Sequence, residues 1–260
     1  MTNLSATNKL RYDLSGRAAL VTGAASGIGQ ATATMLARNG CAVAVNYLRD
    51  DPRGPEAVSN LRQEGLNAIE APGNVGVAGE CEAMVEEACR RLGRLDLLVN
   101  NAGTPGVREV VPPSRIDLIT DDLWNTLVQV NLVGVFRCSK AAAPWLKDSA
   151  GAIVSTASVA GLDFPGSSLA YGATKAGVIS LTKNLARGLA PVRVNAVAPG
   201  AVNSSWQIEW TPEMRQQSID RATLKRRCEP EDLAEVIIFL GFGASMVTGQ
   251  TIVVDGGMTL

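Results

Sequence analysis

Short apolar runs alternate with longer stretches of helical period along most of this chain. The apolar runs are nearly continuous, which is typical of parallel strands that helices cover on both faces. They occupy residues 17–23, 41–47, 67–71, 95–103, 151–158, 192–200 and 251–257. Helices are predicted at residues 27–39, 56–64, 80–91, 171–189 and 230–240, with two more between 121 and 147. The pattern therefore predicts one α/β domain over residues 1–260, a doubly wound parallel sheet of about seven strands with helices on both faces.

Two segments fit neither period. Residues 104–120 are rich in proline and valine, and residues 201–228 contain Trp206 and Trp210. Both follow predicted strand ends, and open α/β sheets bind their ligands at that edge. We therefore expect these segments to border a binding site or a subunit contact.

Composition narrows the class of partner. The formal net charge is -1, and no cluster of lysine and arginine indicates nucleic-acid binding. No apolar run reaches the roughly 18 residues that span a bilayer, and the first residues do not resemble a signal sequence. The five cysteines show no metal or disulfide spacing, which suits a reducing compartment. These features favour a cytoplasmic protein with a small-molecule partner, without nucleic acid, membrane or metal.

The chain contains no histidine. This excludes Ser-His-Asp and Cys-His nucleophile systems and histidine-containing zinc sites. Proton transfer near neutral pH must use another group, so tyrosine and lysine become the leading candidates.

A glycine-rich turn follows the first apolar run. The stretch TGAASGIG, residues 22–29, places Gly23, Gly27 and Gly29 between the first predicted strand and the first helix. Glycines there let the chain turn tightly and admit a pyrophosphate to the helix N-terminus. The spacing is G-x-x-x-G-x-G, and a purely structural turn is the alternative. The stretch NNAG, residues 100–103, ends the fourth apolar run and is either a plain loop or part of the same site.

Several motifs occur together in one order along the chain. TGAASGIG, NNAG, Ser158, YGATK from residue 171 and PG from residue 199 resemble the motifs of the classical short-chain dehydrogenase/reductase family. The resemblance covers essentially the whole chain and is to members such as 3-oxoacyl-carrier-protein reductases and glucose dehydrogenases. It implies a Rossmann-like fold and an NAD(P)-dependent alcohol dehydrogenase or carbonyl reductase. Such an enzyme transfers hydride between nicotinamide and a carbonyl or secondary alcohol.

The resemblance also implies the residues that contact the cofactor. They are Gly23, Ser26, Gly27, Ile28, Gly29, Arg49, Asn74, Val75, Asn101, Ala102, Gly103, Tyr171, Lys175, Pro199, Gly200, Val202 and Ser204. NAD-preferring relatives usually end the second strand with an acidic residue, and Tyr47 occupies that position here. Arg49 follows and can bind a 2′-phosphate, so NADP is expected in preference to NAD. The alternative for Arg49 is a solvated position beside Asp50 and Asp51.

Tyr171 and Lys175 are the strongest candidates for proton transfer. Because they are four residues apart, they lie on one face of a helix, where the ammonium favours the phenolate, as the positive nicotinamide ring of an oxidised cofactor also would. We therefore expect a sheltered pair with a lowered phenol pKa, and an exposed surface pair is the alternative. The resemblance implies that Ser158 holds the substrate oxygen, with Ser155 and Thr156 as rivals.

The resemblance assigns further roles around this pair. Asn131, in VNLVGVF, is similar to the asparagine that completes the family's catalytic tetrad by holding a helix open for a water. Lys175 is implied to bind the nicotinamide ribose and to connect through Asn131 to that water. Pro199 and Gly200 are implied to shape the nicotinamide side, and Ser204 to face the carboxamide.

The substrate and the assembly remain open at this stage. Leu162, Phe164, Trp206 and Trp210 indicate an apolar pocket or, alternatively, core and lid packing. A hydrophobic or oxoacyl ketone and a sugar-like polyol are both compatible with the motifs. A catalytically silent NAD(P)-sensing protein is the alternative function. The family leads us to expect a homotetramer or homodimer.

Overall fold

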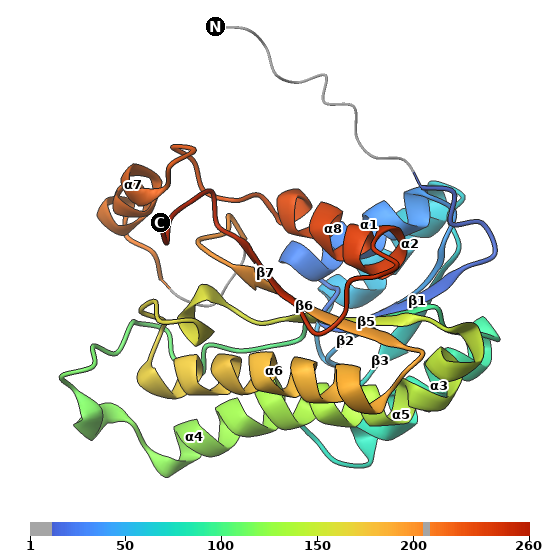
Figure 1. The fold of residues 1–260 in the computed structure, drawn as a ribbon, viewed down its shortest axis with the longest axis horizontal. Coiled ribbons are helices and arrows are strands. Elements are labelled where there is room, and N and C mark those ends of the chain that lie inside the picture. Colours follow the sequence, from blue (N-terminus) through green and yellow to red (C-terminus); the bar gives the residue numbers. More distant parts are fainter. Residues whose placement is uncertain (1–11, 205–208) are drawn as a thin grey trace, which may run out of the picture.

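The computed structural model describes residues 12–204 and 209–260. Its centre is a seven-stranded sheet with the order β3-β2-β1-β4-β5-β6-β7 (Figure 1). The strands are β1 Ala18–Val21, β2 Ala42–Tyr47, β3 Ala68–Pro72, β4 Leu97–Asn100, β5 Ala152–Thr156, β6 Arg193–Pro199 and β7 Thr251–Val254. All neighbouring strands pair in parallel. The predicted Rossmann-like architecture is confirmed.

Helices cover both faces of this sheet. They are α1 Gly27–Arg38, α2 Arg53–Gln63, α3 Glu80–Leu92, α4 Asp121–Val128, α5 Gly134–Ser149, α6 Leu169–Gly188, α7 Pro212–Arg221 and α8 Pro230–Ile238. On β1, Ala19 and Val21 belong to the buried cluster that α1, α2 and α8 complete, whereas Leu20 belongs to the one under α3 and α5. This alternation across a strand explains why both faces are apolar. None of the helices described has both the length and the apolarity to cross a bilayer.

Three helical segments differ from the sequence prediction. The two helices expected between 121 and 147 form one continuous run, because a π-helical segment, Gln129–Val133, joins α4 to α5. Helix α2 begins at Arg53, three residues earlier than predicted. Helix α7 was not predicted at all. Its only buried residue is Ser218, so it lacks the apolar stripe that reveals a helix in a sequence.

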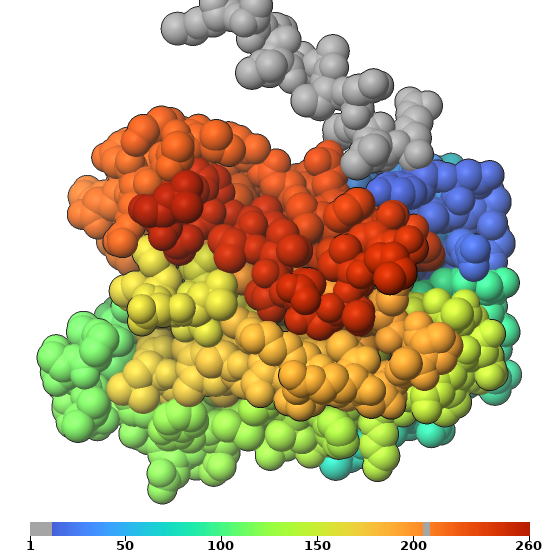
Figure 2. Space-filling view, viewed as in Figure 1, coloured from blue at the N-terminus to red at the C-terminus, as the bar shows by residue number. Residues whose placement is uncertain are grey.

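The segments that follow β4, β5 and β6 gather at one end of the molecule, beyond the carboxyl ends of the strands. The backbone N of Val111 donates to the carbonyl O of Ser167 at 2.9 Å, and that of Glu209 donates to Arg108 at 2.9 Å. In Figure 2 the green, yellow and orange parts of the chain meet at the left end. Both segments that sequence periodicity could not assign therefore border this edge.

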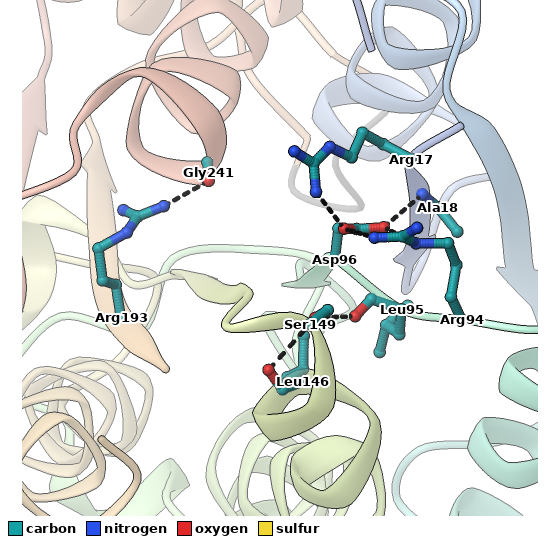
Figure 3. Close-up of polar contacts among 9 residues, drawn as sticks. All are labelled: Arg17, Ala18, Arg94, Leu95, Asp96, Leu146, Ser149, Arg193 and Gly241. Carbon is teal, nitrogen blue, oxygen red and sulfur yellow. Dashed lines mark hydrogen bonds and ion pairs between the residues drawn. The ribbon is translucent and has the colours of Figure 1, made fainter. Parts of the chain in front are cut away.

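The opposite edge of the sheet is closed by charged side chains (Figure 3). Asp96 precedes β4, is 3% exposed, and accepts hydrogen bonds from Arg17, Arg94 and the backbone N of Ala18. Arg193 opens β6 and donates to carbonyl oxygens at the end of the helical run after α8. These contacts fix the amino ends of the strands.

Candidate active site

Tyr171 and Lys175 lie side by side in the first turns of α6. Ser168 caps the helix and accepts a hydrogen bond from the backbone N of Tyr171 at 3.1 Å. Tyr171 is 9% exposed and Lys175 is 3% exposed, and Lys175 Nζ lies 5.7 Å from the centre of the tyrosine ring. Lys175 Nζ also donates to the carbonyl O of Thr156 at 2.8 Å. The pair is sheltered, as predicted, and is not an exposed surface pair.

Glycines on and beside α6 allow its neighbours to come close. A Cβ on Gly172 would lie 3.0 Å from the carbonyl O of Ala160, and one on Gly177 would lie 3.0 Å from Leu132. A Cβ on Gly161 would lie 2.6 Å from the carbonyl C of Lys175. The turn after β5 and the helical run through the π segment therefore pack directly against the face that carries the two candidates.

Ser158 is the hydroxyl that reaches Tyr171. Strand β5 ends at Thr156, and Ser158 caps a short 3₁₀ turn, where its Oγ accepts from the backbone N of Ala160 at 3.1 Å. A side-chain hydrogen bond joins Ser158 to Tyr171. The strand ends before Ser158, so the turn that follows β5 orients the Ser158 side chain.

The two rival hydroxyls are engaged elsewhere. Ser155 is buried and accepts a hydrogen bond from Asn100 Nδ2 at 3.4 Å. Thr156 Oγ1 donates to Asn101 Oδ1, also at 3.4 Å. The geometry therefore favours Ser158 over both as the partner of the phenol.

Burial sets the ionisation of the pair. It raises the pKa of Tyr171 to about 12, and the hydrogen bond from Ser158 offsets only part of this rise. Burial also lowers the pKa of Lys175 to about 8. In the chain alone, burial therefore raises the phenol pKa, whereas the expected lowering also depends on the positive nicotinamide ring of a bound oxidised cofactor. Near neutral pH the phenol is protonated and most of the lysine is charged.

Asn131 clamps the chain after β4 onto the site. It lies within the π-helical segment and is fully buried. Its Oδ1 accepts from the backbone N of Thr104 and its Nδ2 donates to the carbonyl O of Thr104, both at 2.8 Å. A Cβ on Gly103 would lie 3.2 Å from Asn131 Oδ1 and 3.6 Å from Lys175 Nζ. The helix is widened here, as the resemblance implied, but the side-chain amide holds the backbone of Thr104.

The glycine-rich turn after β1 packs against the turn after β4. Gly23 has φ +61°, and a Cβ there would lie 2.8 Å from Ala102 Cα. A Cβ on Gly29 would lie 2.3 Å from the carbonyl O of Gly23 and 2.6 Å from Asn101 Nδ2. Both positions exclude any larger residue, so the two motifs form one surface.

The N-terminus of α1 fits a bound pyrophosphate. Ser26 caps the helix in an extended conformation without a side-chain cap, and the first turn contains no acidic residue. Gly27 has φ +55°, and its Cβ position lies 3.3 Å from Ser204 Cβ. Ile28 packs on the core beneath. Backbone N–H groups without a side-chain cap can donate to phosphate oxygens, and no carboxylate in the first turn competes for them.

Two polar residues that sequence reasoning missed tie these loops together. Thr22 Oγ1 accepts from the backbone N of Asn101 at 2.9 Å and of Ala102 at 3.0 Å. Asn46 Oδ1 accepts from the backbone N of Gly23 at 3.1 Å, and its Nδ2 donates to carbonyls after β3. Each is a polar residue at the end of an apolar strand, and this change from apolar to polar is the sequence feature that could have identified them.

Two residues expected to contact the adenosine half of the cofactor already have hydrogen-bond partners within the chain. Arg49 is exposed, and its Nε donates to Glu80 at 3.1 Å, while Asp51 pairs with Arg53. Arg49 therefore has a carboxylate partner, although not the neighbouring aspartates considered from the sequence. Asn74 Oδ1 accepts from the backbone N of Gly76 at 2.9 Å, which uses its acceptor within the turn.

Two further residues on that side are buried. Val75 is 6% exposed beside Asn74. Tyr47, at the end of β2, is 5% exposed and hydrogen-bonds to Glu70. The Tyr47 ring packs against α2, where a Cβ on Gly54 would lie 2.1 Å from its Cγ, and the position carries no acidic group.

The segment after β6 forms the other wall. Pro199 ends the strand, and a Cβ on Gly200 would lie 2.6 Å from Asp255 Cβ. Val202 pairs with Cys228 as a parallel bridge. The predicted pocket residues Phe164 and Trp210 pack against a cluster of Val159, Ala201, Ala222 and Met258. Leu162 is exposed, and Trp206 lies outside the described residues.

Comparison with known proteins agrees with this geometry. A family model described as enoyl-(acyl carrier protein) reductase matches residues 23–259. A 3-oxoacyl-(acyl-carrier-protein) reductase of Staphylococcus aureus is 38% identical over 93% of this chain and 98% of its own length.

Solved structures are similar over almost the whole chain. A short-chain dehydrogenase from Burkholderia cenocepacia in complex with NADP is 30% identical, with a TM-score of 0.86 over 95% of this chain and 100% of its own. A 3-oxoacyl-(acyl-carrier protein) reductase from Brucella melitensis with bound NAD is 32% identical, with a TM-score of 0.85 over 100% and 97%.

Proposed function

This chain belongs to the short-chain dehydrogenase/reductase family of NAD(P)-dependent oxidoreductases, and we propose that it reduces the 3-oxo group of an acyl thioester with NADPH as preferred donor. The observation that carries the proposal is the set of Ser158, Tyr171 and Lys175 at the carboxyl edge of the sheet, in which Tyr171 and Lys175 are buried and Ser158 hydrogen-bonds to the phenol. Support for the substrate class comes from the Staphylococcus aureus relative, a 3-oxoacyl-(acyl-carrier-protein) reductase.

The residues divide the work of a carbonyl reduction. When bound, a nicotinamide supplies the hydride, and its oxidised ring carries a positive charge. Ser158 and Tyr171 hydrogen-bond to each other, so both can hold one carbonyl oxygen. Tyr171 donates its proton to that oxygen as the carbonyl carbon receives hydride, and the product is the 3-hydroxy compound. Lys175, charged near neutral pH, offsets the phenolate that remains.

The raised phenol pKa suits Tyr171 to the role of proton donor. With a pKa of about 12, Tyr171 is protonated at neutral pH and can act as a general acid without prior activation. The reverse reaction needs the phenolate as a base, and burial makes that form costly in the chain alone.

Three parts of the site would hold the dinucleotide. The N-terminus of α1 from Ser26 to Gly29 suits the pyrophosphate. Lys175 and Ser204 would bind the ribose and the carboxamide of the nicotinamide half, as the family resemblance implies. Arg49 would bind a 2′-phosphate by exchanging Glu80 for it, since an exposed ion pair contributes only about 0–1 kcal/mol.

A substrate screen with both cofactors tests the function. We expect loss of the reduced-nicotinamide absorbance with a neutral 3-oxobutanoyl thioester of N-acetylcysteamine, faster with NADPH than with NADH. Oxidation of glucose or another polyol at a higher rate than any ketone reduction would favour the sugar-dehydrogenase alternative. Tight binding of NADPH without turnover of any ketone or alcohol would favour the sensor alternative.

A further inference from the structure

Arg227 is a buried cation with unused hydrogen-bond donors. It lies between α7 and α8 and is 7% exposed. Its Nη2 donates to the carbonyl O of Val202 at 2.7 Å. Among the residues that the structure describes, neither Nε nor Nη1 has a hydrogen-bond partner. A buried guanidinium left in this state is costly, and such groups usually have a partner.

The carboxylates near Arg227 are already engaged. Glu229 accepts a hydrogen bond from Asn203 Nδ2 at 2.7 Å, and Asp232 pairs with Arg226. Burial, followed by the like charge of Arg215 on α7, lowers the pKa of Arg227. The charge of Glu229 acts on this pKa in the opposite direction, but no carboxylate of the described chain forms an ion pair with the guanidinium.

The position of Arg227 connects it to the site. Its guanidinium carbon lies 4.6 Å from the centre of the Trp210 ring, which holds the planar group by stacking. Trp210 packs on the cluster that contains Val159, the residue after Ser158. Val202, which anchors Nη2, lies in the segment expected to contact the nicotinamide half. Arg227 therefore contacts two segments that lie next to the catalytic serine and the expected cofactor contact.

We propose that Arg227 binds an oxyanion carried by the substrate, so that the enzyme prefers ketones with such a group over neutral ones. A planar, stacked guanidinium with free N–H groups suits a carboxylate or a phosphate oxygen pair. The oxyanion is either the carboxylate of a 3-oxo acid or the phosphate of a phosphopantetheine arm. This inference rests on the reductase function proposed above and specifies its substrate.

Three ketones separate these sources in steady-state assays with NADPH. They are 3-oxobutanoate, the 3-oxobutanoyl thioester of 4′-phosphopantetheine, and the neutral 3-oxobutanoyl thioester of N-acetylcysteamine. We expect wild-type kcat/KM for at least one anionic ketone to exceed that for the neutral one about 10- to 100-fold, as a charged hydrogen bond would give. The anionic ketone that shows the preference identifies the source.

Arg227→Met is the decisive variant. We expect it to abolish the preference by raising KM for the anionic ketone, while the neutral ketone keeps its kcat/KM. Arg221→Met is the matched control, because Arg221 also stacks on an aromatic ring, 4.5 Å from the centre of Phe164, but is exposed. It should leave the preference intact. Arg227→Lys, which keeps the charge and loses the fork, should reduce the preference without removing it.

Thermal unfolding separates recognition from a structural role. Arg227→Met should unfold at the same or a higher temperature than wild type, because it removes an unneutralised buried charge. Equal loss of activity toward all three ketones together with a lower Tm would overturn the proposal, as would a wild type without preference for either anion.

Binding keeps the two proposals separable. If wild type reduces no ketone at all, the reductase proposal fails. The oxyanion site is then still tested by whether 3-oxobutanoate or phosphopantetheine raises the Tm of the NADP-bound protein, and whether Arg227→Met removes that rise. No rise with either probe would overturn the site.

Discussion

The two edges of the central sheet treat buried charge in opposite ways. At the amino edge, Asp96 is surrounded by Arg17, Arg94 and a backbone N–H, and Arg193 binds three carbonyl oxygens (Figure 3). At the carboxyl edge, Lys175 and Arg227 are buried, but within the described residues each donates to a single carbonyl oxygen and neither forms an ion pair. At the amino edge, the protein itself supplies the hydrogen-bond partners of the charged groups there.

The difference separates a structural edge from a functional one. A buried charge that the chain satisfies itself stabilises the fold, since removing one partner leaves the other uncompensated. A buried charge that the chain leaves unsatisfied costs stability and becomes useful only when a ligand arrives. The predictions below test this contrast from both sides.

The largest effect is expected at the phenol. Tyr171→Phe should lower kcat about 10³-fold, because it removes the proton donor, and should leave NADPH affinity unchanged. Turnover is followed by the reduced-nicotinamide absorbance and affinity by fluorescence titration. Tyr47→Phe is the control, since Tyr47 is equally buried but lies on β2 beside Glu70. A wild-type rate in Tyr171→Phe would refute the catalytic assignment.

At the amino edge, Asp96→Asn should destabilise the fold by about 3 kcal/mol while kcat stays unchanged below the unfolding temperature. Asp117→Asn, which breaks the exposed pair with Arg115, should leave the urea unfolding midpoint unchanged. Burial raises the pKa of Asp96, but bonds from Arg94, Ala18 and Arg17 lower it overall. Its contribution is therefore complete above the ordinary carboxyl pKa and is lost as the pH falls through the lowered value.

Methionine substitutions at the two edges should have opposite signs. Arg193→Met should reduce stability by about 2 kcal/mol, because it leaves three carbonyl oxygens without their donor. Lys175→Met should raise the stability of the cofactor-free protein by about 1 kcal/mol, because it removes a buried charge, and should abolish activity. Urea unfolding of both variants measures the difference. Destabilisation of similar size in both would show that the edges are not distinct.

The pH dependence follows from the lowered pKa of Lys175. With a pKa of about 8, Lys175 loses its charge as the pH rises through that value, while Tyr171, with a pKa of about 12, keeps its proton. We expect kcat/KM for NADPH to fall about tenfold between about pH 7 and pH 9. Lys175→Arg keeps the charge and should remove this fall. A flat wild-type profile to pH 10 would contradict the assignment.

The same titration affects stability in the opposite direction. The pKa of Lys175 is lower in the folded protein than in the unfolded chain, so the unfolded chain binds more protons between these two values. Stability of the cofactor-free protein should therefore rise as the pH increases from about 8 toward about 10.4.

The smallest effect is expected at Arg49. Arg49→Ala should weaken NADP binding about 5-fold, near 1 kcal/mol, and should leave NAD binding unchanged. Arg53→Ala is the control, because Arg53 is another exposed arginine after β2 and pairs with Asp51. Equal losses for both dinucleotides would show that Arg49 has no role in choosing between them.

Local patterns determined much of this protein. Apolar runs predicted all seven strands, because the central strands are buried on both faces and even the edge strands β3 and β7 are mostly apolar. The spacing of Tyr171 and Lys175 placed both on one helical face, since four residues make about one turn. Helix α7 was not predicted, because a single buried side chain gives no periodic pattern of apolar residues.

Only the tertiary structure decided the properties that depend on neighbours distant in sequence. It distinguished Ser158 from Ser155, because the end of β5 and the turn after it set the direction of the side chain. It raised the pKa of Tyr171 in the chain alone, because desolvation depends on everything packed around the phenol. It also left Arg227 buried, with two nitrogen atoms that have no hydrogen-bond partner among the described residues. Sequence periodicity is a local property, whereas burial and electrostatics are sums over the whole fold.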